Sequence, residues 1–229
     1  MMILGIETAT TVCGAALARD GVLVHEARID APHVHAERLL TQVDEVLRAA
    51  GCPAGALDGV AVSSGPGSFT GLRIGMSVAK GLAYARSIPL VGVPTLAALA
   101  RRAAARAGAA PGETVLAVLD ARRDEVYCQM FLAGPDGLQE DGDVSDLTVA
   151  EVRLRIRGRK VLAAGDAIGK VFGTGSAREA GWRAAEGDAA SCSAAEIALL
   201  GGRMLAAGQR DDPVTLEPRY IKEFFLRTP

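Results

Sequence analysis

Hydrophobic and polar positions follow two different periods along the chain, and each period predicts a different kind of element. The first thirty residues have the pattern of strands: an apolar run at 2–9 is followed by two short apolar stretches on either side of Asp20-Gly21. An Asp-Gly pair between such stretches is a strong signal for a tight hairpin. We therefore expect three consecutive strands of the antiparallel type at the start of the chain.

Helical periodicity begins after residue 33. Between 34 and 50 the apolar residues recur with a period of 3.6, charged residues occupy most other positions, and Gly51 provides a stop signal. Further along, a glycine-rich turn precedes a second helical stretch, and a proline opens a third one that ends at Gly108. The predicted elements are strands at 57–64 and 88–93 and helices at 34–50, 70–86 and 94–107.

The second half of the chain repeats this arrangement. After a linker at 108–113, two strands surround a polar turn at 121–124, as at the start of the chain. A capping box at Thr148–Glu151 opens a helix, a buried strand follows at 160–165, and an amphipathic helix spans 193–208. We predict an α/β protein of two related lobes, 1–108 and 109–229, each a mixed sheet flanked by helices. The sequence leaves open whether the C-terminal segment packs back on the first lobe.

Composition narrows the class of protein. The 229 residues are 49% hydrophobic and 23% charged, with a formal net charge of −2, as in a globular protein that as a whole is not drawn to nucleic acid or anionic membranes. The four cysteines lie far apart, which excludes CxxC metal or redox pairs and predicts buried reduced thiols. The sequence has neither a signal-like N-terminus nor an apolar stretch long enough for a membrane span. We expect a cytoplasmic location.

Two polar turns are candidate phosphate-binding sites. The stretch "GIETATT" ends a strand in an acid and hydroxyls, and "SSGPGSFTGLR" tightens into a turn that opens a helix, where free N–H groups can hold an anion. Neither turn is a Walker A loop or a GxGxxG motif. Together they predict a phosphate loop, functional or vestigial, formed by Glu7, Thr8, Thr10, Gly65 and Gly67.

The helix behind the second turn carries small residues every four positions, at Gly71, Gly75, Ala79 and Ala83. A ridge without side chains allows another helix to approach more closely than the usual 8–10 Å. Glycine within a helix costs up to about 1 kcal/mol, which tight packing must offset. Either the ridge packs on the chain's own sheet, or it forms a seam with a partner helix.

Six motifs spread over the whole chain form a recognisable set: "ILGIETATTVCGAAL", "HAERLL", "VSSGPGSFTGLRIGMSVAKGLA", "PLVGVPTLAALA", "DARRDEVY" and "EPRYIK". On these motifs the chain resembles the bacterial TsaB (YeaZ) family. It implies the two-lobed actin/hexokinase/Hsp70-like (ASKHA) ATPase fold. It also implies a non-catalytic subunit of the complex that makes threonylcarbamoyladenosine at tRNA position 37. The implied partners are the catalytic subunit TsaD, the ATPase TsaE and, indirectly through the complex, tRNA.

The histidines distinguish this chain from its catalytic relative, which binds a metal through an HxxxH motif and an aspartate. Only His25, His33 and His35 are present, and no two of them are four residues apart. We therefore expect no metal site, with His35 capping a helix or facing solvent.

The second phosphate loop of a working actin-like ATPase should lie at the start of the second lobe. The corresponding stretch, "LDARRDEVY", has no glycine, and although Arg122 and Arg123 could hold phosphate, their side chains would also crowd it. We expect no catalytic residues and no cofactor, with weak or no ATPase activity and with ATP or ADP only at a heterodimer interface. A basic stretch at 152–160 is either a solvated face or a local contact to tRNA phosphates.

The first hypothesis is a dimerisation and activating subunit whose helices at about 34–50 and 70–86 pack on TsaD. A self-complementary surface of this kind also predicts a homodimer when the partner is absent. The alternative is an independent actin-like ATPase or small-molecule kinase, and a metalloprotease would need the missing metal motif. The candidate interface residues are Leu39, Leu40, Val43, Gly71, Gly75 and Ala79.

Overall fold

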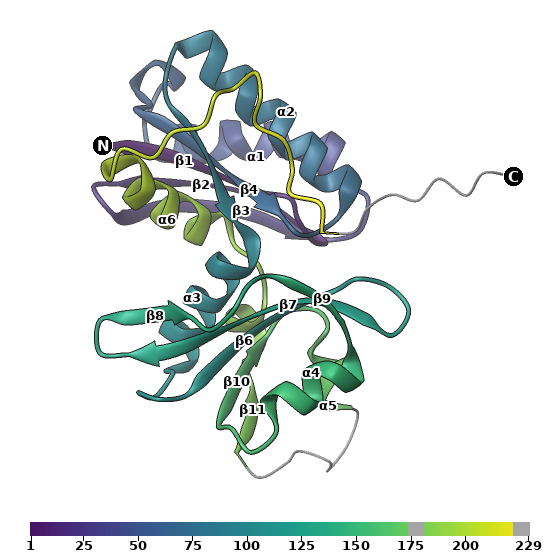
Figure 1. Ribbon diagram of the computed structural model, residues 1–229. Coiled ribbons are helices and arrows are strands. Elements are labelled where there is room, and N and C mark those ends of the chain that lie inside the picture. Colours follow the sequence, from purple (N-terminus) through teal and green to yellow (C-terminus); the bar gives the residue numbers. More distant parts are fainter. Residues whose placement is uncertain (174–180, 222–229) are drawn as a thin grey trace, which may run out of the picture.

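The computed structural model describes residues 1–173 and 181–221 and consists of two lobes, each built on a sheet (Figure 1). The first sheet has the strand order β3-β2-β1-β4-β5. β1, β2 and β3 are joined as antiparallel neighbours, while β4 and β5 are parallel to β1. The strands are β1 (Met2–Glu7), β2 (Val12–Arg19), β3 (Val22–Asp30), β4 (Gly59–Gly65) and β5 (Leu90–Pro94).

The hairpin predicted at Asp20-Gly21 is confirmed. Asp20 has a φ of 51° and Gly21 a φ of 78°, so both central residues lie in the left-handed region. Such a turn matches the twist of the two strands that it joins. The antiparallel start of the first sheet is thus encoded in a two-residue signal.

The second sheet has the order β11-β10-β6-β7-β8, with β9 also paired to β7. The predicted strand–turn–strand at its start is confirmed by the antiparallel pair β6 and β7, and β10 is parallel to β6. Three further strands were not predicted, because they have only three or four residues and no clear alternation. The strands are β6 (Thr114–Asp120), β7 (Glu125–Gly134), β8 (Gly137–Glu140), β9 (Ser145–Thr148), β10 (Val161–Ala164) and β11 (Trp182–Ala184).

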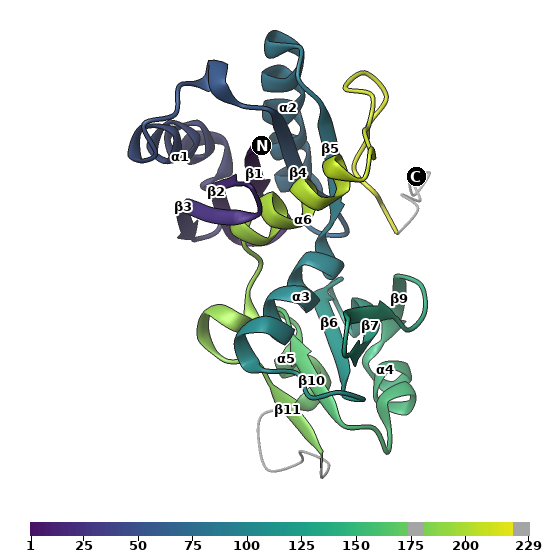
Figure 2. The ribbon, with the colours of Figure 1, turned by 90° about the vertical axis from the view of Figure 1, so that its left-hand side faces the viewer.

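Helices cover both faces of the first sheet (Figure 2). The side chains of β1 alternate between the two faces: Leu4 and Ile6 pack in the cluster beneath α1 (His35–Ala49) and α2 (Phe69–Arg86). Ile3 points the other way, into the cluster beneath α6 (Ala194–Ala206). β1 is therefore buried on both sides, as a central strand requires.

Helices α3 and α6 are exchanged between the lobes relative to their order in the sequence. α3 (Thr95–Ala107) comes from the first half, yet Leu96 and Leu99 pack with Val115 and Phe131 of the second sheet. α6 comes from the second half of the chain and packs on the first sheet, against β1, β2 and β4. For these two helices, the lobe on which each packs is therefore not the lobe that the predicted boundary at 108/109 assigns to it.

Two short helices cover the other face of the second sheet: α4 (Val149–Ile156) and α5 (Ile168–Phe172). The predicted capping box that opens α4 is confirmed, with both reciprocal bonds between Thr148 and Glu151 present. Two 3-10 turns complete the secondary structure, η1 (Ala54–Ala56) and η2 (Gly187–Ala190). The architecture confirms the predicted two-lobed α/β fold with a mixed sheet in each lobe.

The segment that follows α6 runs along the first lobe, beside β5 and α2. The Asp211 amide donates to the Leu90 carbonyl at 2.9 Å, and the Arg219 amide donates to the Ser64 carbonyl at 2.7 Å. Leu216 packs against the core beneath α1 and α2. The question that the sequence left open is answered for residues up to 221: the C-terminal segment packs back on the first lobe.

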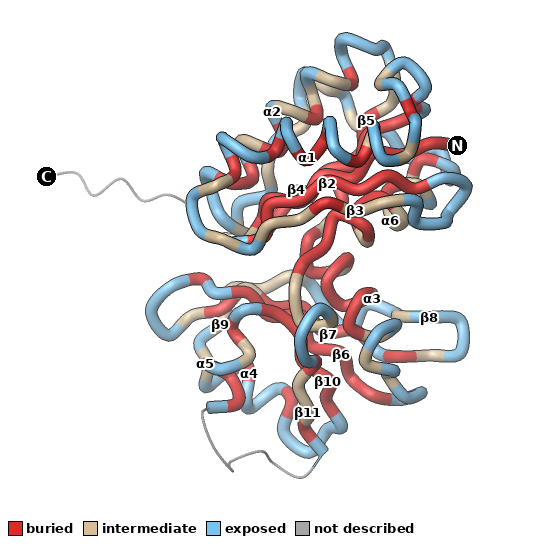
Figure 3. The backbone as a smooth tube through the Cα atoms, turned by 180° about the vertical axis from the view of Figure 1, so that it is seen from behind, coloured by how far each residue is buried: buried red, intermediate tan, exposed pale blue. Residues whose placement is uncertain are grey.

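Burial follows the sheets, whose central strands are buried while turns and outer helix faces are exposed (Figure 3). All four cysteines are buried and unpaired, as predicted. None of the helices in the described ranges is both long and apolar enough to span a bilayer.

Candidate functional site

A cleft of about 1140 Å³ separates the two lobes. One wall consists of the turn between β1 and β2 and the start of α2, and the other of the turn between β6 and β7. The C-terminal segment contributes to the mouth of the cleft. Of the residues that the sequence predicted, the cleft is lined by Thr10, Gly67, Gly71, Arg122 and Arg123.

Glu7 and Thr8 do not line this cleft; they lie buried beneath the turn. Glu7 Oε1 accepts a hydrogen bond from the Ala9 amide at 2.6 Å, and Oε2 has no partner among the described residues. Burial raises the pKa of Glu7 to about 7, against the opposing effect of the Ala9 hydrogen bond. The carboxyl group therefore holds its own turn instead of reaching a ligand.

The amides of the first turn and of the start of α2 are also largely occupied. An anion site at a helix N-terminus needs free N–H groups. Here the chain itself supplies the acceptors. The donors and acceptors are Thr8 N to Ser63 Oγ, Ala9 N to Glu7 Oε1, Val12 N to Thr10 Oγ1, Ser68 N to Ala9 O and Gly71 N to Ser68 Oγ.

The glycines of the "GPG" turn allow close approach of other backbone segments. A Cβ on Gly67 would overlap the Ala9 carbonyl, and one on Gly65 would overlap the Arg219 carbonyl. Gly65 also has a φ of 107°, a conformation that disfavours other residues. These two glycines fit the chain's own packing, whether or not the turn descends from a phosphate loop.

The ridge of small residues on α2 packs inside the chain. A Cβ on Gly71 or Gly75 would overlap atoms of Thr8, and Ala79 and Ala83 are buried in the core. The interpretation of this ridge as a surface open to a partner is therefore corrected: it lets α2 pack directly on the β1–β2 turn. A bulky side chain at Gly75 would disturb the fold itself.

The same correction applies to two candidate interface residues on α1. Leu39 is 1% exposed and Val43 is 5% exposed, so both belong to the core. Leu40, which follows Leu39 but points outward, is 62% exposed. Of the six predicted interface residues, Leu40 is the one that a partner can reach in this structure.

The turn facing the first one, at 120–123, is also closed by its own groups. The Asp120 amide donates to Asp166 Oδ1 at 2.8 Å, and the Arg122 amide donates to Asp120 Oδ1 at 2.6 Å. Lys170 Nζ donates to Asp120 Oδ1 at 2.6 Å and to the Arg123 carbonyl at 2.8 Å. These bonds place two carboxylates where a phosphate loop would offer amides.

The two carboxyl groups differ in their electrostatics. Burial alone would raise the pKa of Asp120, but the hydrogen bonds from Lys170 and from the Arg122 amide hold that pKa below its ordinary value. Burial raises the pKa of Asp166. Asp120 is therefore an anion in the wall of the cleft, and the Lys170 ammonium group balances its charge.

The position of His35 differs from the prediction. It begins α1 but is buried, 7% exposed, with Nε2 placed 3.3 Å from the Val12 carbonyl. The expectation that it caps the helix or faces solvent is wrong, because it fills the space between α1 and β2. Among the residues that the structure describes, no group of three or more His, Cys, Asp or Glu side chains could hold a metal ion.

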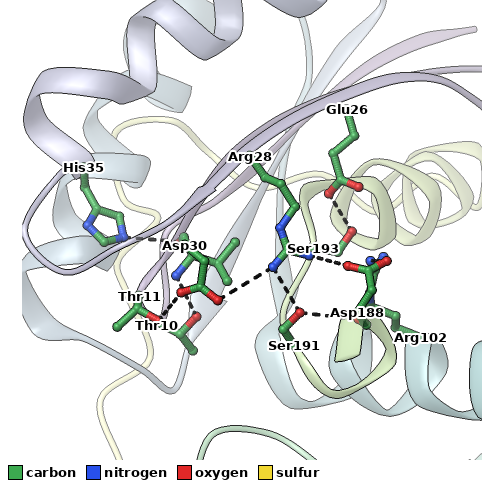
Figure 4. A network of polar contacts seen from close by, with 11 residues as sticks. Thr10, Thr11, Glu26, Arg28, Asp30, His35, Arg102, Asp188, Ser191 and Ser193 are labelled. Carbon is green, nitrogen blue, oxygen red and sulfur yellow. Dashed lines mark hydrogen bonds and ion pairs between the residues drawn. The ribbon is translucent and has the colours of Figure 1, made fainter. Parts of the chain in front are cut away.

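A polar network between the lobes was not predicted (Figure 4). Asp188 of η2 accepts from Arg102 of α3 and from Arg28 of β3. Arg102 is 2% exposed, and its Nε also donates to the Asp188 carbonyl at 2.8 Å. One sequence signal was available: Arg102 lies on the same face of its helix as the apolar residue Leu99.

Comparisons with known proteins agree with this architecture. The profile of the TsaD family, described as tRNA N6-adenosine threonylcarbamoyltransferase, matches residues 29–143. The TsaB protein of Escherichia coli strain K12, a tRNA threonylcarbamoyladenosine biosynthesis protein, is 30% identical over 228 residues, covering 97% of this chain and 95% of its own length. The Haemophilus influenzae TsaB protein is 36% identical over 127 residues, 56% of this chain and 52% of its own.

Solved structures give the same result. YeaZ from Pseudomonas aeruginosa superposes with a TM-score of 0.81 at 31% identity, covering 96% of this chain and 99% of its own. The ethanolamine utilization protein EutJ from Carboxydothermus hydrogenoformans, with a TM-score of 0.53 at 12% identity, shares the fold alone. These likenesses confirm the actin-like fold, and with the full-length sequence match they show that the chain belongs to the TsaB (YeaZ) family of tRNA threonylcarbamoyladenosine biosynthesis proteins.

Proposed function

We propose that this chain is a non-catalytic subunit that docks on TsaD and supports its activity in tRNA threonylcarbamoyladenosine biosynthesis. The observation that carries the proposal is the closed state of both turns of the cleft. Several of their amides are occupied by the chain's own carboxylates, hydroxyls and carbonyls. A protein of this fold that lacks open phosphate loops is better suited to assembly than to phosphoryl transfer.

The proposed docking surface is the groove between α1 and α2. On α1, Leu40 lies on the flank turned toward α2, one helical turn from Ala36. On α2, Ile74 and Val78 lie on the flank turned toward α1, and both are only partly buried. This surface is apolar, unlike the charged outer faces of the helices, and it is continuous with the mouth of the cleft at Ala36 and Ile74.

Gly81 adds an independent argument for close approach at this groove. It lies in the middle of α2, one turn after Val78, and a Cβ there would meet no atom within 4 Å. A glycine inside a helix costs about 1 kcal/mol relative to alanine. Because no packing within the described chain requires it, a partner helix that approaches closely would explain it.

The role that follows is conformational. Docking would order the catalytic partner TsaD, which supplies its own metal and chemistry. TsaE would join this assembly, and the assembled complex would bind tRNA. ATP or ADP would bind only at the heterodimer interface, and the isolated chain would form a homodimer through the same apolar groove. We place this assembly in the cytoplasm.

Co-purification with TsaD from the same organism tests the docking surface. Leu40→Asp and Gly81→Leu should each lower the affinity for TsaD at least tenfold, because one buries a charge and the other blocks close approach. Leu154→Asp is the matched control, since Leu154 is 71% exposed on α4, in the other lobe. Wild-type affinity in both groove variants would refute this surface.

The alternative, an independent ATPase or small-molecule kinase, is favoured by the presence of the cleft itself. Nucleotide titration of the isolated chain distinguishes the two functions. Tight ATP binding with metal-dependent turnover would support the enzyme and overturn the assembly role as the main function.

A further inference from the structure

We propose that the mouth of the cleft binds the sugar–phosphate backbone of RNA directly, so that this chain contacts tRNA itself. The inference rests on the proposed function for the identity of the RNA. The binding site would consist of Arg122 and Arg123 on one wall, Arg219 on the C-terminal segment, and the hydroxyls and the start of α1 in the first lobe.

The cleft gathers positive charge in a protein that is negative as a whole. The chain as a whole carries a net charge of −2. Arg122, Arg123 and Arg219 nevertheless line one cleft, and none of them forms an ion pair within the described part of the chain. The negative charge of Asp120 below them is already balanced by Lys170. A local surplus of guanidinium groups in an acidic protein favours a polyanionic ligand.

The backbone beneath two of these arginines is held in an unusual conformation. Arg122 has a φ of 72° and Arg123 a φ of 50°, both in the left-handed region that residues with side chains rarely adopt. The bonds from the Arg122 amide to Asp120 and from Lys170 to the Arg123 carbonyl fix this turn. Strained turns that the surroundings hold in place are common at binding sites.

The opposite wall offers the other two kinds of phosphate donor. Ser68 Oγ accepts a bond from the Gly71 amide, which leaves its hydroxyl proton for a ligand. The hydroxyl residue Thr70 on α2 lines the cleft, and so does the start of α1, which has no side-chain cap. Arginines, hydroxyls and helix N-termini are the groups that contact nucleic-acid phosphates.

The arrangement fits a long backbone better than a compact nucleotide. The second-lobe wall of the cleft carries the carboxylates of Asp120 and Asp166, and several amides that would surround a triphosphate are occupied. Arg122, Arg123 and Arg219 are exposed and line a cleft of about 1140 Å³, larger than most small-molecule pockets. Side-chain hydroxyl groups can both donate hydrogen bonds to the 2′-hydroxyl of RNA and accept them from it, and an acidic peptide has no such hydroxyl.

Binding of unmodified substrate tRNA, measured by fluorescence anisotropy over a series of salt concentrations, tests the proposal. The full chain and its reconstituted complex with TsaD are both used. Arg122→Gln combined with Arg123→Gln should weaken tRNA binding about tenfold and reduce the slope of log affinity against log salt by about 1.5, because two phosphate contacts are lost. Arg155→Gln combined with Arg157→Gln, at exposed positions in and just after α4, is the matched control and should change neither value.

The outcomes separate this inference from the proposed function. If the Arg122/Arg123 variant complex binds tRNA as the wild type does, the inference is wrong. If polyglutamate displaces tRNA from the complex as well as unlabelled tRNA does, the site recognises acidic peptide and the inference is also overturned. The variant should still co-purify with TsaD. If the wild type does not bind TsaD, the proposed function is refuted, and tRNA binding by the isolated chain then decides the present inference.

Discussion

Asp188→Asn should loosen the junction between the two lobes. Asp188 joins Arg102 of α3 to Arg28 of β3, elements that belong to different lobes by packing. Asparagine keeps the shape of the side chain but removes its charge. The change therefore leaves the guanidinium of Arg102, which is 2% exposed, without its anionic partner.

The magnitude follows from the burial of each partner. Removing one member of a fully buried ion pair costs about 3–5 kcal/mol. Here the Asp188 side chain is 56% exposed, and Arg102 Nε keeps its bond to the Asp188 carbonyl. We therefore expect a loss of about 2 kcal/mol in the free energy of unfolding, or roughly 4–8 °C in melting temperature for a chain of this size.

Urea unfolding monitored by circular dichroism measures the loss, with Asp141→Asn as the matched control. Asp141 pairs with Arg159, but their side chains are 40% and 43% exposed, so this variant should lose under about 0.5 kcal/mol. The hydrogen bond from Arg102 holds the pKa of Asp188 below its ordinary value of 3.8. The stabilisation is thus present above pH 3.8 and is lost as pH falls through the folded-state pKa, so the gap between wild type and variant should close in acid.

Equal stability of the Asp188→Asn and Asp141→Asn variants at neutral pH would refute the reasoning. It would mean that Arg102 does not depend on the Asp188 carboxylate. A large loss that persists unchanged at low pH would point to packing instead of charge, and would contradict the electrostatic explanation in a different way.

Two further predictions concern the turn beneath the cleft and the helix that packs on it. Gly75→Ala should destabilise the fold by about 1–3 kcal/mol, because its Cβ would overlap Thr8 Oγ1. Gly81→Ala, where a Cβ meets no atom, should stabilise the fold by about 1 kcal/mol. Urea unfolding of both variants should show these opposite signs, and equal effects would contradict the packing described for α2. The pKa of Glu7 is raised from 4.5 to about 7, so its folded form holds a proton that the unfolded form releases, and stability should fall as pH rises across that window. Relative to Glu7→Gln, the wild type should lose up to about 3 kcal/mol between those pH values, and a flat difference would show that Glu7 titrates normally.

Much of the fold was predictable because its signals are local. The Asp20-Gly21 hairpin needs only two residues with positive φ. The capping box needs only the bonds that the side chains of Thr148 and Glu151 accept from each other's backbone amides. The short strands β8, β9 and β11 were missed, because a strand of three or four residues depends on its neighbours in the sheet.

The surroundings of each side chain were less predictable. The four-residue spacing of Gly71 and Gly75 is the same whether the ridge meets a partner or the chain's own turn at Thr8, so the sequence cannot distinguish them. The spacing of the histidines excluded an HxxxH pair but did not reveal that His35 is buried. Arg102 was missed because its partner Asp188 is 86 residues away in the chain.

The exchange of α3 and α6 has a consequence for synthesis of the chain on the ribosome. The five strands of the first sheet are complete once residue 94 has been made, but the helix that covers their second face ends only at residue 206. Until then, within the described chain, that face, with Ile3, Ala61 and Val91, is covered only in part, by Ala98 of α3. Exposed apolar surface on a nascent sheet favours aggregation. The first lobe therefore reaches its native packing only after most of the second lobe has been translated, and the two lobes mature together.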